Sequence, residues 1–165
     1  MTTKVILIAV LGVTLVSVAD VLRRDELDAR DAAAFLLLFT ALFVMRVVGQ
    51  IVVLLRAPGW LPPMDEWNLL PYRLLLPIQL AFIAVMVGVA TTLLAEEGPL
   101  AEPDVSFGRF LIGVSLVYAA AMAVRYAVRM ARRPHERWFG GAIPIVFHLV
   151  LAAYLLTLGR FHVTG

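Results

Sequence analysis

Residues 32–55 read AAAFLLLFTALFVMRVVGQIVVLL, an apolar run in which Arg46 is the one charged residue. A helix crosses a hydrocarbon core of about 30 Å with about 20 residues, so this run is long enough to span a bilayer. A transmembrane β-barrel would instead show alternating segments of about ten residues. Four more runs share this apolar character, at residues 4–22, 73–95, 106–130 and 142–159. The sequence therefore predicts an all-α integral membrane protein, a single domain that forms a bundle of five transmembrane helices.

The composition points the same way. The chain has 165 residues, of which 62% are hydrophobic and 16% charged, and its mean hydropathy is +0.92. A soluble domain is about half apolar and about a quarter charged. A water-soluble core of this size cannot enclose so much apolar surface, so lipid must cover much of it. The chain contains no cysteine, which excludes disulfides, thiolate catalysis and cysteine-ligated metals.

Charged residues are distributed unevenly over the predicted loops. The fourth loop is basic, with Arg132, Arg133 and Arg137, whereas the third is acidic from Glu96 to Asp104. The first loop, residues 23–31, carries three arginines and disagrees with this contrast. The excess of basic residues in cytoplasmic loops favours a cytoplasmic N-terminus and an outer C-terminus. We expect a multi-pass protein of the bacterial cytoplasmic membrane.

The first run has an alternative interpretation. Lys4, an apolar stretch and the small residues 17–19 before Asp20 resemble a signal peptide with its cleavage site. We expect the run to be retained as a span, with cleavage of residues 1–19 as the alternative. The remaining topology is the same in both cases.

Five polar residues inside the predicted spans form the candidate binding site. A charge at bilayer depth is costly, so such residues need a partner or a function. At about 1.5 Å per residue, four of the five lie within roughly two turns of the cytoplasmic boundary, and the other lies about one turn deeper. They come from four helices and meet in one pocket if the bundle turns those faces inward. They are Arg46, Gln50, Gln79, Arg125 and His148.

Each of these residues also has a purely structural interpretation. Arg125 can extend to the headgroups, the two glutamines can bond to neighbouring helices, and His148 can be a satisfied core residue. Arg46 fits such explanations least, because it lies deep and the one acidic residue within the predicted spans, Asp20, lies at the outer boundary of the first span. Its partner is then a set of backbone carbonyls, a bound anion, or an acid of another protein.

The fourth span carries a further pattern. Tyr118, Met122, Arg125 and Arg129 are spaced by four, three and four residues. This spacing places them on one stripe of a helix.

The second and fourth loops contain the candidate interfacial contacts. Tryptophan and tyrosine concentrate at the headgroup level of a bilayer, and the four prolines of the second loop prevent a regular helix there. A stiff connector explains the second loop, and a lid over a substrate is its functional alternative. The candidate contacts are Trp60, Asp65, Trp67, Tyr72, Arg73, His135 and Trp138.

His148 and His162 are fourteen residues apart and fall on nearly the same helical face, a pattern that haem ligation could use. That spacing resembles the paired ligands of transmembrane b-type cytochromes. No other predicted span contains a histidine, so a bis-histidine site cannot form within one chain. A His–Met site would need Met45, Met86 or Met122 as the second ligand. We expect no haem, no other cofactor and no metal.

The favoured function is a non-catalytic one. We expect a subunit of a membrane complex, or a binding protein, whose cytoplasm-side polar pocket takes a lipid or a quinone-like amphiphile. Membrane lipids and a protein partner or second copy are the expected partners, and nucleic acid is not. The first alternative is a membrane enzyme acting on a lipid or isoprenoid, with His148 or the pair His135–Glu136 as acid–base groups. The second is a small channel or transporter.

Overall fold

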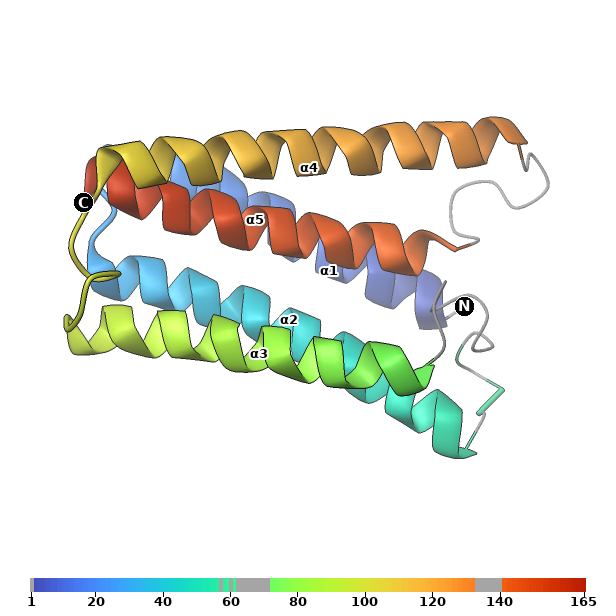
Figure 1. Ribbon diagram of the computed structural model, residues 1–165. Coiled ribbons are helices and arrows are strands. Elements are labelled where there is room, and N and C mark those ends of the chain that lie inside the picture. Colours follow the sequence, from blue (N-terminus) through green and yellow to red (C-terminus); the bar gives the residue numbers. More distant parts are fainter. Residues whose placement is uncertain (1, 57, 60, 62–71, 133–140) are drawn as a thin grey trace.

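The computed structural model describes residues 2–56, 58, 59, 61, 72–132 and 141–165 (Figure 1). These residues form five helices and no strand, and each helix is long and apolar enough to cross a membrane. The all-helical prediction with five candidate spans is therefore confirmed. The helices are α1 Thr2–Arg23, α2 Ala29–Arg56, α3 Tyr72–Ala95, α4 Val105–Arg132 and α5 Ala142–Thr164.

The one boundary that differs clearly from expectation is the end of α5. The predicted span ended near Gly159, but the helix continues to Thr164 and includes His162. Gly159 does not terminate the helix because it is a packing position, where a Cβ would lie 2.9 Å from the carbonyl oxygen of Gly108.

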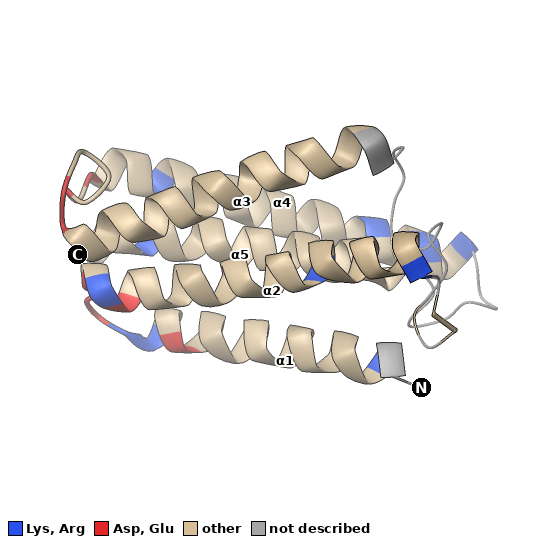
Figure 2. Ribbon diagram, turned by 90° about the horizontal axis from the view of Figure 1, so that it is seen from below, with Lys and Arg blue, Asp and Glu red and all other residues tan. Residues whose placement is uncertain are grey.

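Helix α5 is the centre of the bundle. It packs against α4, α2 and α1, and α2 also packs against α3. Figures 1 and 2 show α1 and α3 on opposite sides of this arrangement. Among the described residues, α3 and α4 have no comparable contact with each other. The side of the bundle between α3 and α4 is therefore open.

The two ends of the bundle differ in charge. One end holds the α1–α2 and α3–α4 connections and the C-terminus, and every described aspartate and glutamate lies there (Figure 2). We call this the acidic end. The opposite end, with the N-terminus, the last turns of α2 and α4 and the first turn of α5, is called the basic end. Its described charges are Lys4, Arg56, Arg129 and Arg132.

Helix termini explain part of this pattern. At the acidic end, Asp28 accepts a hydrogen bond from the backbone N–H of Asp31 at the start of α2. Asp104 does the same for the N–H groups of Ser106 and Phe107 at the start of α4. Acidic residues cap helix N-termini and interact favourably with the helix dipole. The ends of α2 and α4 carry arginines at the basic end for the complementary reason.

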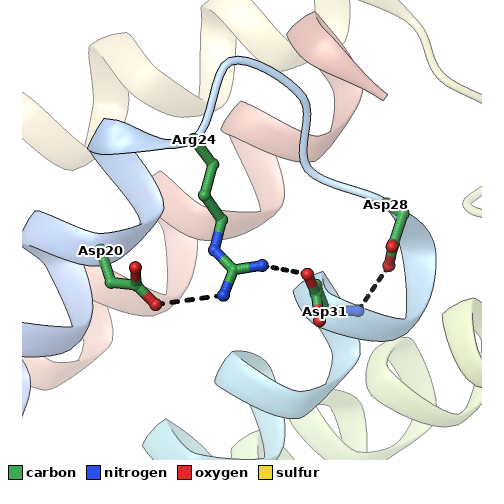
Figure 3. A network of polar contacts seen from close by, with 4 residues as sticks. All are labelled: Asp20, Arg24, Asp28 and Asp31. Atoms are coloured by element: carbon green, nitrogen blue, oxygen red, sulfur yellow. Dashed lines mark hydrogen bonds and ion pairs between the residues drawn. The ribbon is translucent and has the colours of Figure 1, made fainter.

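Arginines of the first connection are held by carboxylates. Arg24 pairs with Asp20, at 3.2 Å, and with Asp31 (Figure 3). Its hydrogen bond to Asp20, supported by the negative charges of both aspartates, raises the pKa of Arg24 above its ordinary value. Arg30 lies 3.5 Å from Glu96. The first loop was the exception to the predicted charge difference between the two ends because it carries three arginines. Nearby carboxylates offset the charge of two of them, Arg24 and Arg30.

Candidate functional site

A cavity of about 290 Å³ lies on the open side of the bundle. Helices α2 and α5 form its floor, and α3 and α4 form its walls. Two side chains of α3 at its edge, Ile78 and Phe82, are 49% and 53% exposed, as expected where the cavity opens sideways. We call it the α3–α4 groove. Its lining comprises Phe43, Arg46, Leu75, Ile78, Gln79, Phe82, Tyr118, Arg125, Pro144, His148 and Leu151.

Four of the five predicted pocket residues line this groove, namely Arg46, Gln79, Arg125 and His148. Gln50 does not line it. Its fully buried side chain lies behind Gln79 and accepts a hydrogen bond of 2.9 Å from the Gln79 amide. The structure thus places Gln50 between α2 and α3 as an interhelical contact.

Arg46 lies on the floor of the groove and is only 7% exposed. Its guanidinium carbon is 6.0 Å from the ring centre of Phe43 and 5.9 Å from that of Phe147. Contacts with aromatic faces stabilise a cation within about 6 Å of the ring centre. Arg46 also lines a smaller cavity of about 220 Å³ that is bounded by α1, α2 and α5. Its charge therefore reaches the groove from a position held between aromatic rings.

Tyr118 is a groove residue that the sequence did not single out as a site. Its hydroxyl lies 2.5 Å from Nδ1 of His148, and the two rings meet edge to face with centres 5.7 Å apart. The stripe on the fourth span contained the signal, because Tyr118 and Arg125 are two turns apart on it. Tyr118 and Arg125 line the groove, whereas Met122 lines a pocket on the other side of α4.

Gln79 has one polar atom unsatisfied. Its side chain is 2% exposed, and its Oε1 has no hydrogen-bond partner among the described residues. The bond to Gln50 uses the Gln79 amide nitrogen, and exchanging oxygen and nitrogen in both amides together would reverse its direction. In either arrangement, one polar atom of the Gln79 amide is left without a hydrogen-bond partner among the described residues, and Gln79 lines the groove.

The groove is electrically positive. Two guanidinium groups, from Arg46 and Arg125, contribute to it, and none of its described lining residues is a carboxylate. Counted from the ends of their helices, Arg46, Gln79, Arg125 and His148 lie roughly 10 to 15 Å from the basic end. Apart from the hydroxyl of Tyr118, the remainder of the lining is apolar. This arrangement suits a molecule with an anionic head and an apolar tail.

Of the seven candidate contacts predicted in the loops, two fall within a described helix and five do not. Trp60, Asp65, Trp67, His135 and Trp138 lie outside the described residues. Tyr72 and Arg73 form the first turn of α3, and their side chains lie outside the described part as well.

The two histidines of α5 have separate polar partners. His148 bonds to Tyr118 in the groove, whereas Nδ1 of His162 accepts the N–H of Asp104 at 3.2 Å near the acidic end. Within the described ranges, no three His, Asp or Glu side chains gather as metal ligands would.

Comparison with known proteins gives no relative. No protein-family model, no curated protein and no solved structure matches the chain. The geometry of the groove is therefore the basis for assigning a function.

Proposed function

We propose that this protein is a multi-pass membrane protein that binds an amphiphile with a phosphate-bearing headgroup in the α3–α4 groove. The observation that supports this proposal is the convergence of Arg46, Arg125, Tyr118, His148 and Gln79 on one laterally open cavity. Arginine is well suited to phosphate because its planar guanidinium donates several hydrogen bonds in a fixed geometry.

The shape of the groove fits part of an amphiphile. Its volume of about 290 Å³ is at the lower limit of typical ligand pockets, about 300 to 1,000 Å³. It therefore accommodates a headgroup and the beginning of a chain. The tail extends sideways between the exposed apolar surfaces of α3 and α4, such as Phe82 and Val117. Access from the bilayer follows from the lack of an extensive α3–α4 contact.

The orientation proposed here places the basic end in the cytoplasm. Basic residues near the ends of spans favour the cytoplasmic side, and Lys4, Arg56, Arg129 and Arg132 lie at that end. The groove's polar layer then opens toward the cytoplasmic leaflet of the bacterial cytoplasmic membrane. An amphiphile of that leaflet reaches the groove without crossing the bilayer.

The proposed role is non-catalytic, as a binding subunit of a membrane complex or of an assembly of copies of this chain. Short connections, and a groove whose described lining residues include no catalytic triad, suit that role. A quinone is the alternative ligand, since hydrogen-bond donors in the groove can also bind its carbonyls.

Mass spectrometry of the protein purified in mild detergent tests the proposal. We expect a phosphate-bearing lipid or isoprenoid to co-purify with the wild type and to be depleted in the double variant Arg46→Gln, Arg125→Gln. Arg132→Gln is the matched control, because it removes an exposed basic charge at the same end. A monomer without amphiphile, or equal depletion in the control, contradicts the proposal, and a co-purified quinone replaces the ligand class.

A membrane enzyme acting on a lipid phosphate is the second candidate, favoured by the Tyr118–His148 hydrogen bond beside two arginines. A histidine bonded to a tyrosine hydroxyl can act as an acid–base group. Replacing His148 with Gln then abolishes turnover of any lipid that accumulates in a deletion strain. Unchanged turnover excludes His148 from catalysis.

A further inference from the structure

A second pocket lies across α4 from the groove, between α1, α4 and α5. Its volume is about 440 Å³, and α5 forms its floor. Figure 1 shows α1 behind α5, so that this pocket and the α3–α4 groove occupy different sides of the bundle. The lining comprises Leu7, Ile8, Leu11, Met122, Ala123, Tyr126, Ala142, Ile145, Val146 and Leu149. Apart from the phenol of Tyr126, these side chains are apolar.

Two cationic residues lie at the basic end of this pocket. Lys4 is exposed and precedes the lining residues Leu7 and Ile8 by one helical turn. Arg129 lies about one turn beyond Tyr126 on α4 and extends over the start of α5. Its guanidinium lies against Gly141, where even a Cβ would overlap it. The pocket is thus apolar along its length and cationic at the end nearest the proposed cytoplasmic surface.

The pocket volume argues against a helix as the occupant. An α-helix is about 10 to 12 Å across and rises 5.4 Å per turn, so roughly a single turn would fill this pocket. A transmembrane helix needs several turns. A flexible hydrocarbon chain fits because it needs no polar partner and adapts to the gaps beside Ala123 and Ala142.

We infer that the pocket between α1, α4 and α5 binds one acyl chain of an anionic phospholipid, with its headgroup at Lys4 and Arg129. The site involves other residues than the α3–α4 groove and does not depend on the proposed function. The apolar lining takes the chain, and the two cations favour anionic over zwitterionic headgroups. Each basic residue near an anionic lipid surface contributes about fivefold in affinity, roughly 30-fold for the pair.

Native mass spectrometry of delipidated protein in detergent tests this inference. The probe is phosphatidylglycerol, compared with phosphatidylcholine of the same chains. Ala123→Phe fills the pocket, and Ala120→Phe is the matched control, because Ala120 is an exposed residue of the same helix that lines no described cavity. We expect Ala123→Phe to retain one tightly bound phosphatidylglycerol fewer than Ala120→Phe. Equal retention by the two variants overturns the inference.

A charge variant gives an independent result. Lys4→Gln together with Arg129→Gln removes both cations without filling the pocket. At the site that Ala123→Phe fills, we expect the affinity for phosphatidylglycerol to fall roughly 30-fold. The affinity for phosphatidylcholine at this site is expected to stay the same. An unchanged preference for phosphatidylglycerol overturns the inference, even if Ala123→Phe fails to fold.

The two lipid sites are separated by their variants. Arg46→Gln with Arg125→Gln affects the groove, and Ala123→Phe affects the pocket. If Ala123→Phe removes a lipid and the groove variant removes none, the inference holds and the proposed function fails. If the groove variant removes an amphiphile and Ala123→Phe removes none, the proposed function holds and the inference fails.

Discussion

Gly108 of α4 and Gly159 of α5 pack directly against each other. A Cβ on Gly108 would lie 2.7 Å from the Gly159 carbonyl oxygen, and a Cβ on Gly159 would lie 2.9 Å from that of Gly108. Small residues let transmembrane helices approach closely. This contact joins α4 to α5 near the acidic end, while among the described residues α4 makes no comparable contact with α3.

Replacing Gly108 with Ala is expected to destabilise the bundle by about 1 to 3 kcal/mol, the usual cost of overpacking. The added methyl group meets backbone and the Cβ of His162, which cannot move away easily. Gly113→Ala on the same helix is the control and is expected to be neutral, since nothing lies within 4 Å of its Cβ. Reversible unfolding in mixed micelles measures the difference. Equal stability of the two variants contradicts the described α4–α5 contact.

The Gln50–Gln79 hydrogen bond predicts an energetic coupling between α2 and α3. Interhelical bonds of this kind average about 0.6 kcal/mol in membranes, with a maximum near 1.7. We expect Gln50→Leu and Gln79→Leu each to destabilise the protein, and the double variant to cost less than the sum. A double-mutant cycle measures the coupling. Strict additivity would show that the two amides do not interact.

Tyr118→Phe separates ligand binding from stability. It removes the bond to His148 in the groove. Tyr154→Phe removes a bond of 2.8 Å to the backbone of Met86, and Tyr154 does not line the groove. We expect both variants to lose about 1 kcal/mol of stability or less, and only Tyr118→Phe to lose co-purifying amphiphile. Equal amphiphile content in the two variants argues that the Tyr118–His148 pair is merely structural.

The proposed orientation can be tested with single cysteines, because the natural chain has none. Glu97 follows the end of α3 at the acidic end and Arg132 ends α4 at the basic end, and both are exposed. In spheroplasts, a membrane-impermeant maleimide is expected to label Glu97→Cys directly and Arg132→Cys only after the membrane is permeabilised. The opposite labelling pattern reverses the proposed topology.

The fold follows largely from the sequence, because lipid allows few backbone arrangements and an apolar run of sufficient length predicts a helix. The continuation of α5 beyond Gly159 was not predicted, because Gly159 serves helix packing and its partner Gly108 comes from another run of the sequence.

The candidate site was predictable in its residues and less so in its geometry. The depth of Arg46, Gln79, Arg125 and His148 follows from counting residues along each helix. Which sides of the helices face each other depends on side-chain packing between distant runs. For that reason the sequence could not place Gln50 behind the groove, nor identify the partnership of Tyr118 and His148.

The most direct measurement of the central claim is site-specific photo-crosslinking to lipid from α3. Ile78 lines the groove, whereas Leu80 is similarly exposed and lines no described cavity, with exposed fractions of 49% and 52%. A photoreactive residue at position 78 is expected to capture a phosphate-bearing amphiphile, and Arg46→Gln with Arg125→Gln is expected to abolish that product. A residue at position 80 should capture bulk lipid regardless of these variants. Equal products at both positions, or capture at 78 that survives the loss of both arginines, would contradict binding in the groove.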